Sequence, residues 1–184
     1  DEENIKVVPG MAKEWEFSED GRTITFFLRD DVPWVTYNAM SGEVEEVLDC
    51  EGNPRMVDAH DFYYGIIRTL DPDTASDYAY VLSFALEGAG PFNLGETDDP
   101  ETVGVKVIDD YTLSLTFNQE AAYNLNIAGM WIASALPKWL IEGDDCTEAR
   151  GDRWTETGFF QGYGPFVMKE WVHDAYVTVA KNAF

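Results

Sequence analysis

The chain has 184 residues, of which 45% are apolar and 14% aromatic, enough to bury a hydrophobic core in one domain or one and a half. Its 35 acidic and 12 basic residues leave a net charge of −23, which repels phosphate backbones and anionic membrane surfaces and argues against nucleic acid as a partner. The acidic residues are scattered, a pattern that serves solubility or adaptation to salt and would also steer a cationic ligand. No stretch approaches the roughly 18–20 continuous apolar residues of a membrane span.

The N-terminal part predicts a β-hairpin followed by an irregular excursion. Residues 12–17 and 23–29 alternate between apolar and polar side chains, the period of a strand with one buried face, and Gly21 in the turn between them can adopt a positive φ. Residues 37–53 are polar, acidic and contain glycine. We interpret them as an excursion with a small hairpin around Ser41 and Gly42.

A helix is predicted over residues 58–70. Asp58 is a good N-cap, and Asp61 three residues later gives a pair of the capping-box type at the positive end of the helix. Apolar residues then recur at helical spacing as far as Leu70. The helix is expected to end at Asp71, because the residue before a proline avoids the α region.

A second helix is predicted after this proline-containing corner. Ser76 or Asp77 is expected to cap it, which places Tyr78 in its first turn, and residues 88–91, with two glycines and a proline, are expected to end it. An aromatic side chain at such a place can project into a cleft or pack in the core. The sequence by itself leaves both options open for Tyr78.

The second half of the chain predicts another hairpin, two helices and a final pair of strands. The hairpin is expected to turn at Asp109 and Asp110, and the last strands at His173 and Asp174. The predicted ranges are 103–108 and 111–117 for the hairpin, 121–131 and 137–141 for the helices, and 166–172 and 176–180 for the last strands. Hairpins mixed with separate helices indicate an α+β fold class, with a mixed sheet and packed helices.

A glycine-flanked bend precedes the last strand pair, with Gly162, Tyr163, Gly164 and Pro165 before Phe166. Two glycines and a proline let the backbone approach something closely, which is either a packed neighbour or a ligand. No helix follows the bend, so the sequence does not indicate a phosphate-binding loop.

The two cysteines, Cys50 and Cys146, lie far apart in the sequence. In an exported protein they could form a disulfide that closes a long loop and stabilises the fold by about 4–5 kcal/mol. As free thiols they would be two small loop residues. Spacing alone leaves both states open.

The sequence offers no clear catalytic or metal-binding motif. His60 and His173 are the only histidines, and no G-x-S-x-G nucleophile elbow accompanies them. Together with Cys50 and Cys146 they lack the closely spaced ligand pairs of a zinc site, and the aspartates at 71, 73 and 77 lack the glycine and the terminal glutamate of a calcium loop. We therefore expect no metal, no cofactor and no enzymatic activity.

Four segments, in the correct order along nearly the whole chain, resemble the pattern of the extracellular solute-binding proteins of family 5, which serve ABC transporters of peptides and nickel. They are P-G-M-A-K-E-W at 9–15 with D-G-R-T-I-T-F-F-L-R at 20–29, D-A-H-D-F at 58–62 through D-P at 71–72, the hairpin at 105–117, and G-Y-G-P-F at 162–166 with K-E-W at 169–171 and Asn182. Residues 74–79 further resemble the oligopeptide-binding branch, in which the tyrosine that matches Tyr78 lies on the ligand cleft. Residues 35–51 depart from the family pattern, which leaves the shape of that edge of the cleft open.

The resemblance implies a partial lobe of a periplasmic-binding-protein-like fold. Residues 1–160 would form the smaller subdomain of the N-terminal lobe, and residues 161–184 a strand pair of the main sheet subdomain of the same lobe. Ligand contacts are expected at Tyr78 and at the bend formed by Tyr163, Gly164 and Pro165, with Trp34 and Tyr37 at the rim of the cleft.

The resemblance also implies a function, that of the substrate-binding component of an ABC importer. Such a protein captures oligopeptides or related small solutes outside the cytoplasm, as a periplasmic protein or a cell-surface lipoprotein, and delivers them to a membrane permease. The expected partners are the solute, the transmembrane subunits of the permease and the C-terminal lobe of the same protein, because the chain looks like an excised fragment.

A second interpretation stays open, that of an acidic carbohydrate-binding module or a glycosidase. Trp34, Trp131 and Trp154 would then stack on sugar rings, and carboxylates would supply the chemistry. Nothing in the sequence marks two carboxylates as facing each other across a cleft.

Overall fold

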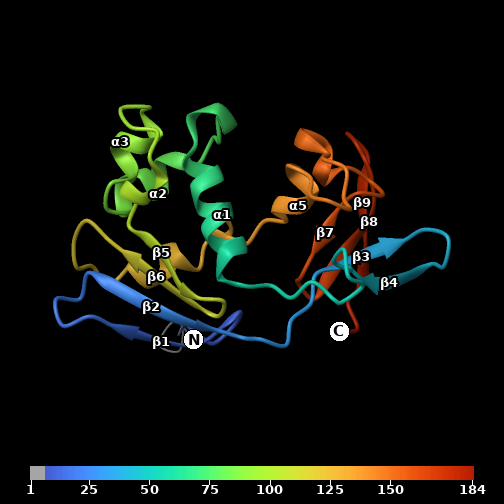
Figure 1. The fold of residues 1–184 in the computed structure, drawn as a ribbon, viewed down its shortest axis with the longest axis horizontal. Coiled ribbons are helices and arrows are strands. Elements are labelled where there is room, and N and C mark those ends of the chain that lie inside the picture. Colours follow the sequence, from blue (N-terminus) through green and yellow to red (C-terminus); the bar gives the residue numbers. More distant parts are fainter. Residues whose placement is uncertain (1–6) are drawn as a thin grey trace. The chain divides into compact units, whose positions relative to one another are not determined.

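The computed structural model describes residues 7–184, which divide into two compact units. Unit 1 contains the described residues up to Arg29 together with Asp58–Leu136, and unit 2 contains Asp30–Val57 together with Pro137–Phe184 (Figure 1). Each unit is therefore built from two separate stretches of chain. This division differs from the single boundary between residues 160 and 161 expected from the sequence, because the strand that begins at Val35 pairs with residues 161–162.

Unit 1 is built around a four-stranded antiparallel sheet with the spatial order β1-β2-β6-β5. Its strands are β1 (Ala12–Phe17), β2 (Thr23–Leu28), β5 (Val105–Asp109) and β6 (Thr112–Thr116). The alternation along β2 sends Ile24, Phe26 and Leu28 to the buried face, and Phe26 lies opposite Leu113 of β6. Both hairpins predicted for this part of the chain are confirmed, the second with its turn at residues 110–111, one position later than expected.

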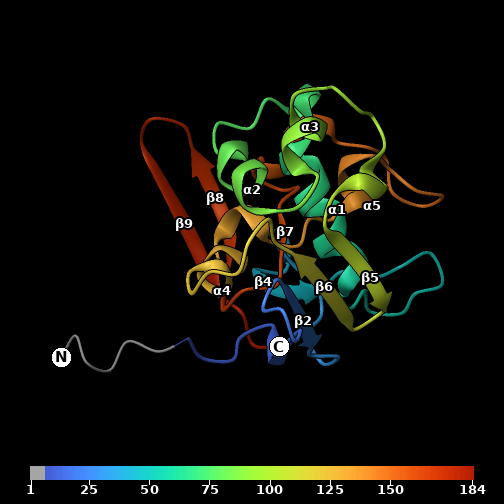
Figure 2. The ribbon, with the colours of Figure 1, turned by 90° about the vertical axis from the view of Figure 1, so that its left-hand side faces the viewer.

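Helices cover one face of this sheet (Figures 1 and 2). The first, α1 (Ala59–Leu70), begins at the predicted N-cap: the Asp58 carboxylate accepts hydrogen bonds from the backbone N–H groups of His60 and Asp61, at 2.8 and 3.2 Å. The Asp61 carboxylate in turn accepts one from the Asp58 N–H at 3.3 Å, which completes the capping box. The helix ends at Leu70 before the proline, as predicted.

The second helix begins later than predicted. Neither Ser76 nor Asp77 caps it, because a 3₁₀ turn occupies Pro72–Thr74 and α2 (Ala79–Ala85) has Tyr78 at its N-cap position without a side-chain hydrogen bond. α2 ends at Ala85, so residues 88–91, which were expected to end it, lie beyond it. Gly88 takes a φ of +69° and lies so close to the Thr102 carbonyl that an added Cβ would be 1.8 Å from the oxygen. The chain turns there into a further helix, α3 (Ala89–Asn93).

The last helical segments of unit 1 are shorter than the predicted range 121–131. α4 covers Asn124–Ala128, and Gly129 ends it by donating its N–H to the carbonyls of Leu125 and Asn126, both at 3.2 Å. A separate 3₁₀ turn follows at Trp131–Ala133. No helix within residues 7–184 has the length and apolar character needed to cross a membrane.

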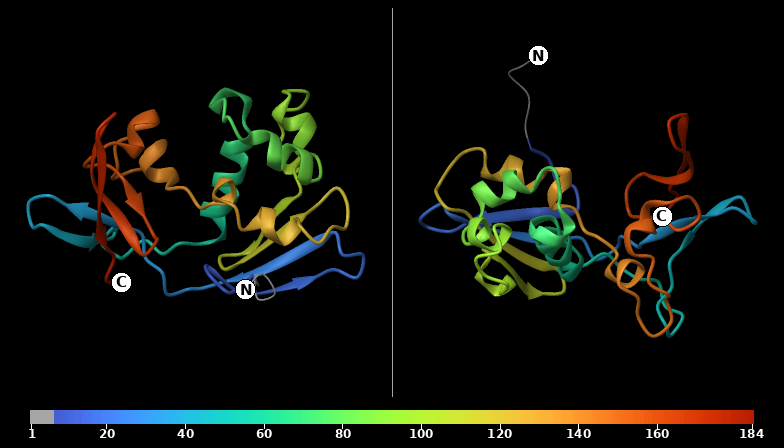
Figure 3. Two further views of the ribbon diagram at one scale, coloured as in Figure 1. Left: turned by 180° about the vertical axis from the view of Figure 1, so that it is seen from behind. Right: turned by 90° about the horizontal axis from the view of Figure 1, so that it is seen from above.

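Unit 2 combines two small sheets with one short helix. Its elements are β3 (Val35–Asn38), β4 (Glu43–Glu46), α5 (Lys138–Ile141), a 3₁₀ turn at Gly151–Thr155, β7 (Gln161–Gly162), β8 (Phe166–Val172) and β9 (Tyr176–Lys181). β3 and β4 form the hairpin expected around Ser41 and Gly42, and β3 also pairs with β7. The β8–β9 hairpin is formed as predicted and lies beside the β3–β4 hairpin (Figure 3).

Tyr63 on α1 offers a pH probe of unit 1. Burial, together with the hydrogen bond that its hydroxyl donates to the Glu101 carboxylate at 3.1 Å, raises the pKa of Tyr63 to about 12. The folded state therefore holds this proton more tightly than the unfolded chain, in which a tyrosine pKa is about 10. The stability contributed by the protonated hydroxyl is complete below pH about 10 and is lost as the pH rises towards 12.

An ultraviolet absorbance titration of the native chain should accordingly show one tyrosine that ionises near pH 12, and Tyr63→Phe should remove this phase. A native titration in which Tyr63→Phe removes only an ordinary phase near pH 10 would contradict the assignment.

Candidate ligand-binding surfaces

Tyr78 lies at the surface of unit 1, not in its core. It occupies the N-cap position of α2 and is 46% exposed. Its ring meets that of Trp131 edge-on, with centroids 4.8 Å apart, and lies 6.3 Å from that of Tyr80. Trp131 and Tyr80 are 63% and 66% exposed. We call Tyr78, Tyr80 and Trp131 the aromatic surface.

The aromatic surface has the features of a ligand contact and few of those of a packed core. Covering exposed aromatic rings with a ligand removes apolar surface from water, which is favourable. Rings that already pack edge-to-face are held in place, so binding a ligand orders them little further. Trp131 owes its position to the 3₁₀ turn that follows Gly129. Sequence reasoning considered Trp131 only as a platform for sugars, because nothing in the spacing of residues 78 and 131 shows that they meet.

Trp34 corrects one expectation for unit 2. It is 1% exposed and packs edge-on against the rings of Trp139 and Tyr163, with centroids at 5.4 and 5.0 Å. The ring therefore belongs to the core of unit 2, and the prediction that Trp34 stands at the rim of a cleft is wrong. Its position is explained by β3, which begins at the next residue and buries Val35 as well.

Tyr37 and Tyr163 are half-buried within unit 2. The Tyr37 ring lies on β3 with the ammonium of Lys169 5.3 Å from its centroid, which is a cation–π arrangement. The Tyr163 ring is held against Trp34, so its position is fixed by the core below it. Their contact with a ligand stays a prediction.

The bend before β8 is fastened by Asn182. Its side-chain Nδ2 donates to the Gly164 carbonyl at 3.0 Å, and its backbone N–H donates to the Pro165 carbonyl at 2.9 Å. A Cβ at Gly162 would lie 3.0 Å from the Phe160 ring, so this glycine accommodates a packed neighbour. Tyr78 belongs to unit 1 and the bend to unit 2, and the expectation that they line one groove stays a prediction.

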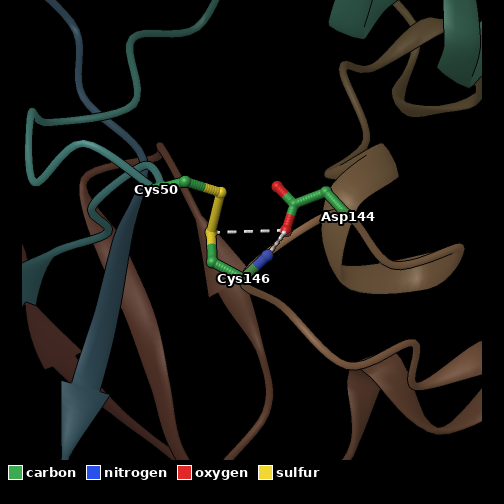
Figure 4. Close-up of side chains that lie close together, drawn as sticks. All are labelled: Cys50, Asp144 and Cys146. Atoms are coloured by element: carbon green, nitrogen blue, oxygen red, sulfur yellow. Dashed lines mark hydrogen bonds between the residues drawn. A yellow bond between two sulfur atoms is a disulfide. The ribbon is translucent and has the colours of Figure 1, made fainter.

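Cys50 and Cys146 form a disulfide in unit 2 (Figure 4). Asp144 lies beside it and accepts hydrogen bonds from the N–H groups of Cys146 and Thr147, at 3.0 and 2.7 Å. Arg55 forms an ion pair with the same carboxylate and places its guanidinium 4.6 Å from the centre of the Trp139 ring. The loop that contains Cys50 and Arg55 is thus joined to the loop that contains Asp144 and Cys146 by a disulfide and an ion pair.

Electrostatics at this junction follow from the same contacts. Burial by itself would raise the pKa of Asp144, but the hydrogen bonds from Cys146, Arg55 and Thr147 outweigh it and hold the pKa below its ordinary value. Cys50, Asp144 and Cys146 are the group in residues 7–184 whose ligand atoms lie close enough together for a metal ion. Both sulfurs, however, are bonded to each other in the disulfide. A disulfide sulfur is not the thiolate that binds metals, so the cluster does not form a metal centre in this state.

The histidines and the remaining tryptophan fit structural roles. His60 lies 3.7 Å from an Asp110 carboxylate oxygen, and His173 lies 3.2 Å from Glu156 with its ring stacked on Trp171. Both histidine side chains are more than half exposed. Trp154 is half-buried and stacks on Phe160. Of the three tryptophans considered as sugar platforms, Trp131 is therefore the one that presents a largely open ring.

Comparisons with known proteins connect this geometry to a class of protein. A family model described as bacterial extracellular solute-binding proteins, family 5 Middle, matches residues 6–183. The periplasmic oligopeptide-binding protein OppA of Escherichia coli (strain K12) is 31% identical over 175 residues, which cover 95% of this chain and 28% of OppA. The dipeptide-binding protein DppE of Bacillus subtilis (strain 168) is 29% identical over 182 residues, which cover 95% of this chain and 27% of DppE.

Solved structures show the same relation in three dimensions. Haemophilus influenzae OppA in complex with RPPGFSPFR superposes with a TM-score of 0.78 at 27% identity, covering 97% of this chain and 30% of that one. The likeness confirms the predicted α+β fold class and the expectation of a partial lobe. The chain spans less than a third of the length of these relatives.

Proposed function

This chain belongs to the bacterial extracellular solute-binding proteins of family 5, and we propose that it is a ligand-facing part of a peptide-binding protein that serves an ABC importer. The observation that carries the proposal is the aromatic surface. Tyr78, the residue at which the sequence resembles the oligopeptide-binding branch, is exposed and braced by Trp131. The curated relatives include proteins named for oligopeptide and dipeptide binding, which supports a peptide as the solute.

The proposed mechanism is capture by differential affinity. A second lobe, supplied by the rest of the protein, would close over a peptide held against the aromatic surface. A ligand that contacts both lobes when they are closed and one lobe when they are open shifts the population towards the closed state. Closure would then be the signal read by the transmembrane subunits of the permease, outside the cytoplasm.

We propose binding without catalysis. The relatives named by the comparisons are substrate-binding proteins, and the two histidines sit in exposed turns or helix starts beside carboxylates. A carbohydrate-active role is not favoured, because Trp34 is buried and Trp154 is covered on one face by Phe160.

The test measures peptide affinity in the full-length protein that contains this segment. We expect Tyr78→Ala and Trp131→Ala each to weaken peptide binding by about tenfold, because each removes a large aromatic contact. Isothermal titration calorimetry with a panel of short peptides gives the affinities. Ile108→Ala is the matched control, since Ile108 is similarly exposed at 60% but lies on β5, outside the aromatic surface.

Two results would count against the proposal in different ways. Peptide binding that is unchanged in both variants would remove the aromatic surface from the site. A full-length protein that binds sugars and ignores the whole peptide panel would overturn the peptide-binding function itself.

A further inference from the structure

A pocket of about 320 Å³ lies in unit 1 beside the C-terminal half of α2 and the segment that leads into α4. Its size is at the lower end of the roughly 300–1,000 Å³ typical of small-molecule sites. The lining residues are Phe84, Ala85, Asn118, Gln119, Tyr123 and Asn124. None of them belongs to the aromatic surface.

The polar groups left over in this pocket are mainly acceptors. Asn118 uses its Nδ2 twice, on the carbonyls of Phe84 and Leu86 at 2.9 and 3.1 Å. The Nε2 of Gln119 donates to the Tyr123 hydroxyl at 2.8 Å, and the Nδ2 of Asn124 donates to the Gln119 carbonyl at 2.9 Å. The carbonyl partners fix which end of the Asn118 and Asn124 carboxamides is the nitrogen. With the Gln119 nitrogen on the Tyr123 hydroxyl, as in this structure, three amide oxygens remain.

The oxygen of Asn124 is the most telling of the three. The residue is 2% exposed as a whole, and the side-chain oxygen is a part of it that keeps accessible area. Within the part of the chain that the structure describes, no donor reaches the side-chain oxygens of Asn118, Gln119 or Asn124. An accessible acceptor that has no donor from the protein can take one from a bound ligand in place of water.

The other walls favour a cation. Phe84 and Tyr123 contribute aromatic rings that are 67% and 42% exposed, and ring faces attract ammonium and guanidinium groups. No lysine or arginine occurs between Arg68 and Lys106, or between Lys106 and Lys138, so the segments that form the pocket carry no cation of their own. Arg22, whose Nε donates to the Phe117 carbonyl at 3.0 Å, is paired with Glu87. The net charge of −23 adds a negative potential that also attracts a cation.

We propose that this pocket is a second binding site, for a small organic cation with a primary ammonium or guanidinium head. Three amide oxygens match the three N–H donors of a primary ammonium, and the two rings cover its alkyl chain and the outer part of its charge. The site stands on unit 1 alone and does not depend on the peptide-binding function proposed above.

The test is a nuclear magnetic resonance titration of the isotope-labelled 184-residue chain with butylammonium chloride and, separately, with the neutral isostere 1-butanol. A ligand of this size is expected to bind with a Kd of about 1 mM. Shifts should appear at the side-chain amides of Asn118, Gln119 and Asn124 with the ammonium and be absent with the alcohol. Butylguanidinium in a third titration shows which cationic head is preferred.

Two variants make the result specific. Phe84→Ala, which trims an exposed ring, should weaken binding by about three- to fivefold. Gln119→Glu should tighten it by a similar factor, because a carboxylate there can still accept a hydrogen bond from the Tyr123 hydroxyl while adding a negative charge. Tyr78→Ala and Ile108→Ala should leave it unchanged.

Two outcomes would overturn the site. Equal shifts with the alcohol would show an apolar pocket without cation recognition. Shifts spread over the acidic loops, and unaffected by Phe84→Ala and Gln119→Glu, would show attraction to the net charge alone. Failure here leaves the peptide titrations of the full-length protein untouched.

Discussion

Reduction of the Cys50–Cys146 disulfide is expected to lower the free energy of unfolding of the chain by about 3–5 kcal/mol. The bond joins the two stretches of unit 2 across the whole of Asp58–Leu136, with a sequence separation of 96 residues. If the chain unfolds as one cooperative body, the cross-link restrains a loop of about 100 residues in the unfolded state, and the expected loss on reduction is about 4.7 kcal/mol.

A smaller loss is expected if unit 1 stays folded while unit 2 unfolds. The ends of its long segment are held together within unit 1, where the Leu136 N–H donates to the Asp61 carbonyl at 3.1 Å. The free loop then shrinks to residues 50–57 and 137–146, roughly 20 residues, for which the loss is about 3 kcal/mol. The size of the effect therefore reports how strongly the two units are coupled in unfolding.

Guanidinium unfolding with and without dithiothreitol, followed by tryptophan fluorescence, measures this loss. A Cys50→Ser/Cys146→Ser double variant is the control, since it should be destabilised at the outset and should not respond to the reductant. A wild-type midpoint that does not move on reduction would show that the disulfide is absent or restrains little. The Arg55–Asp144 ion pair remains in both states, so it does not contribute to the difference.

The elements that could be predicted from the sequence are those whose signals are local. The first hairpin, the capping box of α1 and its end before Pro72, and the final strands β8 and β9 all follow from alternation, a side-chain cap or a proline within a few residues. The predicted start of α2 was wrong, although it also rested on local signals. A 3₁₀ turn occupies Pro72–Thr74 and α2 begins only at Ala79, so Tyr78 stands at the N-cap position and not Ser76 or Asp77.

The site depended on contacts that the sequence does not encode locally. Tyr78 meets Trp131 across more than fifty positions, and Trp34 is buried by Trp139 and Tyr163 from the other stretch of unit 2. An aromatic residue has the same composition signal in a core and at a cleft, and tertiary packing decides which of the two it occupies. The pocket beside α2 and α4 was likewise missed. Its acceptor character arises because backbone carbonyls bind the amide nitrogens of Asn118 and Asn124 and leave their oxygens, and the sequence does not show these bonds.

Gly65→Ala is expected to destabilise unit 1, although the exchange favours the helix itself. Gly65 lies within α1, where alanine gains about 1 kcal/mol over glycine in intrinsic helix propensity. An added Cβ would, however, stand 2.1 Å from the carbonyl oxygen of Ser134 and 3.2 Å from its carbon. These are backbone atoms, so no rotamer change relieves the overlap.

The segment around Ser134 cannot simply move away from α1. Thr69 donates its hydroxyl to the Ile132 carbonyl at 3.1 Å, and the Leu136 N–H donates to the Asp61 carbonyl at 3.1 Å, so the segment is fastened to the helix on both sides of the contact. Overpacking in such a place costs about 1–3 kcal/mol or more. The cost exceeds the propensity gain, and a net loss of about 2 kcal/mol in the free energy of unfolding is expected.

Chemical unfolding of Gly65→Ala beside Gly129→Ala separates the two terms. A Cβ at Gly129 would meet nothing closer than 3.6 Å, which is ordinary van der Waals contact, so this variant should stay within about 0.5 kcal/mol of the parent. A Gly65→Ala variant that is as stable as the parent, or more stable, would contradict the close contact between α1 and Ser134. The position of Trp131 beside Tyr78 would then be in question as well, because Trp131 belongs to the same segment as Ser134.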